Sequence, residues 1–308
     1  MRKGKINFVV IGAQKAGTTW LYSRLSELPD FSMPPIKELH YFDRDKKYPS
    51  PTELRKTYLI NRLININWIK RTARIYLKLL KAKEYKNLRW YFKWYLSNFN
   101  DKWYLSLFHN LLGITGDISP SYSIINEEDV KKMHEAIPDV KVIFMLRNPI
   151  DRAWSNYRFG LRFCNKEFIA SQNINDMIKF FNSDAQELRS NYTRTIDLFS
   201  KYYPKENILL GFYDAIAEQP KNLLHNIVEF LGGDTSNIEE KCEIKEINNI
   251  SLKMEMPCEV REFLSQKYKP LLADLSNRYG EYCTRWAQDS PENNKSFTLL
   301  SPTLKLEE

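Results

Sequence analysis

Residues 7–25 read NFVVIGAQKAGTTWLYSRL, and this stretch decides the fold that the sequence predicts. Residues 8–11 are apolar and largely β-branched, as in a strand that is buried on both faces. A loop of mostly small residues follows, and then Leu21, Leu25 and Leu28 recur at helical spacing before Pro29. A glycine loop between a strand and a helix offers free N–H groups and the positive end of the helix dipole to an anion. We therefore predict a phosphate-binding site at this loop.

The position of the lysine separates this loop from a Walker A motif. Gly12 and Gly17 have the Walker A spacing, but Thr18 and Thr19 stand where that motif has Lys followed by Ser or Thr. The lysine is Lys15, inside the loop, and no obvious carboxylate for Mg²⁺ follows the later strands. We expect a nucleotide phosphate to bind here without a metal ion. A P-loop kinase or NTPase, which needs Mg²⁺ and ATP, is the alternative enzyme.

Two motifs resemble those of sulfotransferases that use 3′-phosphoadenylyl sulfate (PAPS). The loop that binds the 5′-phosphosulfate in that family is similar to Lys15, Ala16, Gly17, Thr18, Thr19 and Trp20. The family's 3′-phosphate site is similar to Arg147, Asn148 and Pro149, followed eight residues after Arg147 by Ser155. The resemblance implies that both motifs bind PAPS and that Lys15 also takes part in catalysis. From the residues alone, Arg147 and Ser155 could equally belong to an ordinary capped helix.

A carboxylate and an imidazole, Glu38 and His40, follow two prolines. In an extended segment their side chains would point to the same face and could act together as a general base. A surface loop with solvated charges is the alternative that the residues leave open. Residues 38–43 resemble the Glu-x-His-Phe-Phe-Asp segment of glycan sulfotransferases, in which the glutamate is the proposed base. The resemblance implies catalytic roles for Glu38 and His40 and leaves open which of them accepts the proton.

Residues 54–110 are rich in Lys and Arg, interleaved with aromatic residues. Leu63, Ile66, Ile69, Ala73 and Leu77 step by three or four and would share one helix face. A nucleic-acid or membrane-interface segment is one interpretation of this composition. We favour a helical cap inserted into the core fold, with its lysines on the solvent side and the acceptor pocket beside it.

Strand and helix patterns alternate through the rest of the chain. Short strands are predicted before Pro120, at residues 140–146 and at residues 208–213, and a helix follows Pro220. This alternation indicates the α/β class, with a P-loop-like three-layer fold, a central parallel sheet and helices on both faces. Residues 117–122 resemble the Glu-Lys-Thr-Pro-Ala-Tyr stretch of glycan sulfotransferases. Ile118 replaces the lysine, so any role of that cation is missing or supplied elsewhere.

We predict a single sulfotransferase domain over residues 1–288 and a disordered polar tail over residues 289–308. Residues 165–195 indicate a looser segment, and residues 242–286 indicate a loop followed by two helices. Many sulfotransferases close this region over the nucleotide with a basic glycine loop, which this sequence lacks. Lys245 or Lys253, with Asn249 and Ser251, are candidates to replace it.

Composition sets wider bounds on the function. The 308 residues are 43% hydrophobic and 14% aromatic, which excludes wholesale disorder. The net charge of +8 suits a polyanionic cosubstrate, but it would equally suit nucleic acid or a membrane surface. The sequence has no apolar run of the roughly 18 residues that a membrane span needs, and the first apolar run is too short for a signal peptide. We expect a cytoplasmic protein, and the four cysteines, without Cys-x-x-Cys spacing, favour free thiols.

The resemblance as a whole implies in-line transfer of the sulfuryl group from PAPS to a hydroxyl or amine, without a metal. A cytoplasmic protein favours a small-molecule acceptor such as a natural product or lipid. The motifs similar to glycan enzymes keep a glycan acceptor open. We expect no nucleic-acid partner, and the sequence leaves the oligomeric state open.

Overall fold

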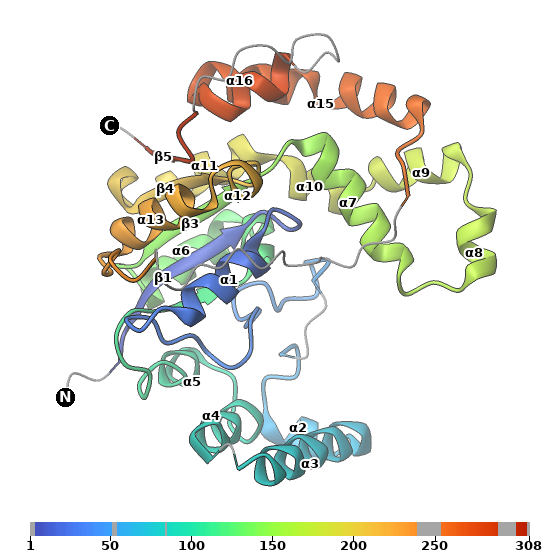
Figure 1. Ribbon diagram of the computed structural model, residues 1–308. Helices are drawn as coiled ribbons and strands as arrows, with labels where there is room; N and C mark the ends of the chain where they lie inside the picture. The colour runs from blue at the N-terminus through green and yellow to red at the C-terminus, as the bar shows by residue number, and fades with distance from the viewer. Residues whose placement is uncertain (1–3, 51–53, 84, 239–253, 289–299, 307–308) are drawn as a thin grey trace.

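The computed structural model of the chain describes residues 4–50, 54–83, 85–238, 254–288 and 300–306. Within these ranges the strands form one sheet in the order β2-β1-β3-β4-β5 (Figure 1). Their bounds are β1 (Ile6–Gly12), β2 (Thr115–Ile118), β3 (Lys141–Leu146), β4 (Ile208–Phe212) and β5 (Thr303–Lys305). Neighbours among the first four strands are parallel, and β5 is an antiparallel edge strand beside β4. The predicted α/β class is confirmed, with an antiparallel edge added to the parallel sheet.

Helices cover both faces of this sheet. One face carries α1 (Thr18–Glu27) and α13 (Pro220–Leu231), and the other carries α6 (Glu127–Ala136) and α11 (Tyr192–Ser200) (Figure 1). Leu21 and Leu25 of α1 are completely buried, as their spacing predicts. On the opposite face, the rings of Phe144 in β3 and Tyr192 in α11 lie 5.6 Å apart, edge to face. The central strands are therefore buried on both sides, which is why their sequences are continuously apolar.

The strand order reverses beside β1, since the chain passes to β2 on one side of β1 and returns to β3 on the other. In open α/β sheets, ligands bind outside the carboxyl ends of the strands where the order reverses. The loop at residues 13–17 follows β1, and Arg147 follows β3, so both lie at this point. Strand β2, which lies on the other side of β1 from β3, ends at the same edge of the sheet and leads into a 3₁₀ turn, η1 (Pro120–Ile124).

A helical insertion precedes β2, as predicted within residues 54–110. Its helices are α2 (Leu59–Leu63), α3 (Ile66–Lys81), α4 (Tyr85–Tyr95) and α5 (Asp101–Ser106), at one end of the molecule (Figure 1). Trp68 and Tyr76 of α3 face Tyr95 of α4, with ring centroids 6.0 and 6.5 Å away. The predicted apolar face from Leu63 to Leu77 does not make this contact, because those side chains are exposed. None of the helices in the described ranges has the length and hydrophobicity that crossing a bilayer requires.

The looser segment predicted at residues 165–195 is largely helical, so that prediction was wrong. After α7 (Pro149–Leu161) come α8 (Lys166–Ser171), α9 (Ile174–Phe181) and α10 (Asp184–Ser190), which lead to α11. The side chains of Asn165, Asn173 and Asn191 each accept a hydrogen bond from a backbone N–H in the first turn of the next helix. The polar residues that suggested a loop are helix N-caps.

The predicted pair of C-terminal helices is present as α15 (Cys258–Tyr279) and α16 (Glu281–Gln288). Two short elements, η2 (Lys205–Asn207) and α12 (Ala215–Glu218), come before and after β4.

The predicted disordered tail is wrong for residues 300–306, because β5 lies within them. Asn226 of α13 also donates a 3.0 Å hydrogen bond to the Thr303 hydroxyl. A three-residue strand carries no sequence signal of its own, and pairing with the edge of β4 orders it. The candidates Lys245, Asn249, Ser251 and Lys253 lie outside the described residues.

Candidate active site

The loop after β1 turns sharply into α1. Gly17 has φ of 82°, and a Cβ there would lie 2.2 Å from the Ile216 side chain, so the turn requires glycine. The Ala13 N–H donates to the Met145 carbonyl of β3 at 2.6 Å, which fixes the loop to the sheet edge. Of the predicted loop residues, Ala16, Thr18 and Trp20 are buried, whereas Thr19 is exposed at the first turn of α1. The first N–H groups of a helix have no partner within it, so this turn can receive an anion.

Arg147 is held against this loop. Its guanidinium donates a 3.0 Å hydrogen bond to the Lys15 carbonyl and lies 4.2 Å from the centre of the Tyr213 ring. The Tyr192 hydroxyl donates to the Arg147 carbonyl at 2.9 Å. The two motifs, more than a hundred residues apart in the sequence, therefore form one site. Ser155 is buried two turns into α7, whose start at Pro149 and cap at Asn148 agree with the prediction.

Lys15 lies among cations. Burial and the charges of Arg147, Arg162 and Arg158 lower the pKa of Lys15 to about 8. Its ammonium is 4.1 Å from the centre of the Phe159 ring. Sequence reasoning missed Arg158 and Arg162. Helical spacing could have found them, because Arg158 of α7 and Arg162, the C-cap of α7, follow Ser155 by three and seven residues.

Glu38 and His40 lie on a loop across the end of β2, but not in the extended conformation that we expected. Their φ angles are 64° and 52°, a left-handed region that is unfavourable for residues other than glycine. Backbone contacts hold the turn: the Glu38 N–H donates to the Ile118 carbonyl at 3.1 Å, and the His40 N–H donates to the Ser119 hydroxyl at 3.3 Å. The two side chains do meet, with His40 Nε2 3.5 Å from Glu38 Oε2.

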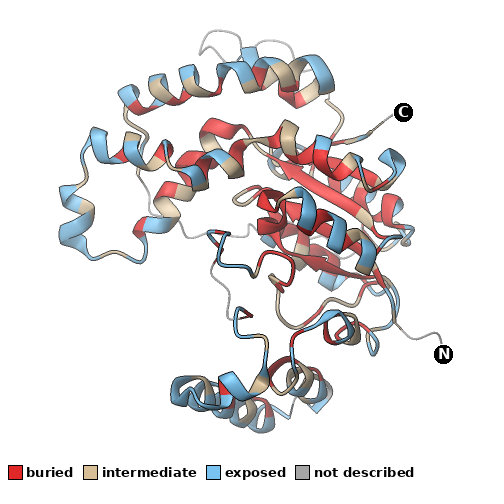
Figure 2. Ribbon diagram, turned by 180° about the vertical axis from the view of Figure 1, so that it is seen from behind, coloured by how far each residue is buried: buried red, intermediate tan, exposed pale blue. Residues whose placement is uncertain are grey.

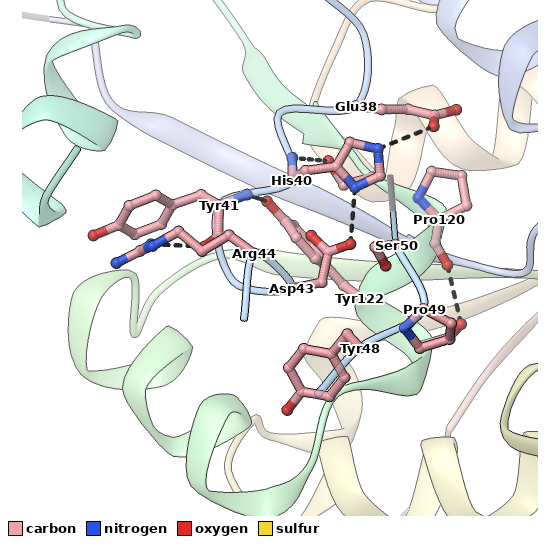
Figure 3. A network of polar contacts seen from close by, with 12 residues as sticks. Glu38, His40, Tyr41, Asp43, Arg44, Tyr48, Pro49, Ser50, Pro120 and Tyr122 are labelled. Carbon is pink, nitrogen blue, oxygen red and sulfur yellow. Dashed lines mark hydrogen bonds and ion pairs between the residues drawn. The ribbon is translucent and has the colours of Figure 1, made fainter. Parts of the chain in front are cut away.

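His40 is placed between two carboxylates (Figure 3). Its Nδ1 lies 2.8 Å from Asp43 Oδ2, and the Asp43 side chain is completely buried. Burial alone would lower the pKa of His40, but Asp43 and Glu38 outweigh it and raise that pKa to about 10. Burial alone would raise the pKa of Glu38, but His40 and the ion pair with Lys37 lower it to about 2. At neutral pH the group is an imidazolium between two carboxylates.

Asp117, at the end of β2, supports the loop that carries Glu38 and His40. It is buried and accepts hydrogen bonds from the hydroxyls of Ser119 at 2.7 Å, Tyr122 at 2.6 Å and Tyr104 at 3.0 Å. Tyr104 belongs to α5, so the helical insertion contributes directly to the support of the site. The Tyr122 hydroxyl in turn accepts the Tyr41 N–H at 3.0 Å. The polar side chains of this segment thus form a buried, hydrogen-bonded support beneath the Glu38 turn.

The geometry brings most predicted site residues to one sheet edge. Lys15, Arg147 and Ser155 lie on one side of it, and Glu38 with His40 lies on the other, near enough for the charge of Glu38 to act on the pKa of Lys15. Within the described ranges, no three His, Cys, Asp or Glu side chains are grouped so that they could hold a metal ion.

Comparisons with known proteins point to one family. The sulfotransferase domain family model matches residues 5–256. A membrane-associated sulfotransferase of Dictyostelium discoideum is 26% identical over 160 residues, which are 52% of this chain and 24% of that protein. The chain thus spans about a quarter of the length of this curated relative.

A solved sulfotransferase structure shares this fold. A sulfotransferase from Alicyclobacillus acidocaldarius superposes with a TM-score of 0.60 at 21% identity, covering 92% of this chain and 98% of that one. The sulfotransferase domain of the Synechococcus PCC 7002 olefin synthase gives a TM-score of 0.49 at 16% identity, covering 87% and 96%. With the family model matched over most of its length, this chain belongs to the sulfotransferase family.

Proposed function

We propose that the sulfuryl donor is PAPS and that the chain transfers its sulfuryl group to a hydroxyl or amine. The observation that carries this proposal is the joining of the two anion motifs, through the hydrogen bond from Arg147 to the Lys15 carbonyl. A donor with phosphates at both its 5′ and 3′ positions needs two anion sites close together. The positive charge of these two anion sites comes from Lys15, Arg147, Arg158 and Arg162. The three arginines lie close enough to Lys15 to lower its pKa.

In this proposal, different residues around the loop bind different parts of the donor. The N–H groups at the start of α1, with Thr18 and Thr19, hold the 5′-phosphate. Arg147 and Ser155 hold the 3′-phosphate through charge-assisted hydrogen bonds. Lys15 neutralises the charge that develops on the leaving phosphate oxygen, a role in which a fixed cation acts mainly in the transition state.

Glu38, rather than His40, accepts the acceptor's proton in this proposal. An imidazolium has no free nitrogen lone pair, and the raised pKa keeps His40 in that form at neutral pH. The Glu38 carboxylate is ionised and can accept a proton as the attacking oxygen becomes more acidic during bond formation. His40 and Asp43 then act by holding Glu38 in place. Its low pKa makes Glu38 a weak base, which suits an attack in which proton transfer comes late.

The acceptor is a small molecule, such as a natural product or lipid, or a glycan, and we propose a cytoplasmic location. The test is incubation of the full chain with radiolabelled PAPS and a metabolite extract, without added Mg²⁺, followed by identification of the sulfated compound. Glu38→Gln is the matched control, because it keeps the shape of the side chain and removes its basicity. Labelling of a compound by the parent chain but not by the variant supports the proposal. Transfer of phosphate from ATP with Mg²⁺, and no transfer from PAPS, would overturn it.

A further inference from the structure

An apolar stripe faces outward along α3. Ile66, Ile69, Leu77 and Leu80 are 59%, 39%, 59% and 47% exposed, and Ala73 lies between them at the same helical spacing. Other apolar residues of the helical insertion are exposed as well: Ile60 and Ile64 at α2, and Phe92 on α4, at 64%, 79% and 56%. Figure 2 shows the outer surface of these helices mostly in the colour of exposed residues.

This stripe is not the face by which α3 packs on the protein. The packed face carries Trp68, Thr72, Tyr76 and Leu79, of which Thr72 and Leu79 are buried and the two aromatic rings face Tyr95. By the angular step of a helix, the exposed stripe is centred about 105° from the packed face. Helix α3 is therefore apolar on two faces, and only one of them is covered by the residues that the structure describes. Contiguous exposed apolar residues of this kind mark interaction sites.

A row of cations borders the stripe on its other side. Lys70, Arg74, Lys78 and Lys81 are exposed, and none of the four forms an ion pair with any residue in the part of the chain that the structure describes. Across residues 59–95 the sequence has ten Lys and Arg residues and a single acidic one, Glu84. The exposed apolar stripe thus lies in a strongly positive surface.

We propose that α2, α3 and α4 dock on an anionic lipid surface. In this arrangement α3 lies in the plane of the bilayer interface, with its Ile and Leu stripe inserted and its lysines at the headgroups. A second copy of the chain is a poor occupant, because a self-complementary contact would bring two positive surfaces together. Nucleic acid is a poor occupant too, because the stripe on α3 is aliphatic and bases stack on aromatic rings. An anionic bilayer satisfies both the apolar stripe and the charge.

The experiment is flotation of the full chain with vesicles of phosphatidylcholine alone and with vesicles that also contain phosphatidylserine. Three variants are compared with the parent: a stripe variant (Ile66→Ser, Ile69→Ser, Leu77→Ser), a charge variant (Lys70→Gln, Arg74→Gln, Lys78→Gln), and a control (Lys131→Gln, Lys205→Gln, Lys269→Gln). The control removes the same charge from exposed lysines elsewhere on the surface. Circular dichroism checks that each variant keeps its helical content.

We expect binding only to phosphatidylserine vesicles, and weaker binding as salt rises. The charge variant should lose roughly fivefold in affinity for each cation removed, and the stripe variant should lose at least about tenfold. The control should change little. The proposal is overturned if the parent does not bind the vesicles, or if folded stripe and control variants bind equally well. It is also overturned if the parent instead forms a dimer, or binds RNA, through the stripe. None of these results depends on sulfotransferase activity, so they are separate from the test of the proposed function.

Discussion

Lys15 is expected to take up a proton when the product nucleotide, adenosine 3′,5′-bisphosphate, binds. In the free protein, burial and the three neighbouring arginines lower the pKa of Lys15 to about 8, so its ammonium is partly deprotonated slightly above neutral pH. The product carries on its 5′-phosphate the charge that Lys15 is proposed to neutralise. Binding should therefore favour the ammonium and raise the pKa of Lys15, by the same linkage that couples protonation to stability.

The size of the expected change in product affinity follows from the Lys15 pKa of about 8. Well below that pH the affinity should not depend on pH through Lys15, because the ammonium is already present. Above it, each pH unit should cost about tenfold in affinity, or about 1.4 kcal/mol, until the pKa of the complex is reached. Between about pH 7 and pH 9 we expect a loss of about tenfold, and binding at about pH 8 should take up about half a proton.

The assay is isothermal titration calorimetry of the product in two buffers with different ionisation enthalpies, whose difference in heat gives the protons taken up. Lys15→Arg is the matched variant, because an arginine stays charged over this range and should abolish both the proton uptake and the pH dependence. Lys15→Met should bind the product weakly at every pH. If the parent takes up no proton at about pH 8 and its affinity stays constant, Lys15 does not contact the 5′-phosphate charge, and the proposed catalytic role falls.

Four further outcomes are expected. Arg147→Ala should weaken binding of the 3′,5′-bisphosphate by roughly one to two decades and spare the analogue without the 3′-phosphate; equal losses would make Arg147 structural. Glu38→Gln should leave product affinity unchanged and cut turnover by roughly two to four decades, whereas an active Glu38→Gln beside an inactive His40→Asn would make the imidazole the base. Lys37→Met should raise the pKa of Glu38 and move the acidic limb of the pH–rate profile upward, and an unmoved limb would exclude Glu38 as the titrating base. Folding raises the pKa of His40 to about 10, so protonated His40 stabilises the fold fully below about pH 6.5, and this stabilisation is lost as the pH rises to about 10. Denaturant titrations should show this decline in stability for the parent and not for His40→Asn.

The sequence by itself determined the elements that have a strong local signal. The buried strands at β1 and β3, the glycine at the turn into α1 and the Asn148 cap are all dictated by neighbouring residues, because burial on both faces, a φ of 82° and free helix N–H groups each demand a particular residue type. The same local rules placed Lys15 and Arg147 at strand ends. Since parallel strands share one carboxyl edge, their meeting there could be foreseen.

The tertiary structure decided what depends on partners far away in the sequence. It is the hydrogen bonds to Ile118 and Ser119 that hold Glu38 and His40 in left-handed conformations, and no local pattern encodes that turn. Helical spacing correctly grouped Ile66 with Leu77 but could not tell which apolar face of α3 would be covered, since that depends on where Tyr95 packs. The same holds for β5, whose three residues become a strand only because β4 offers them an unpaired edge.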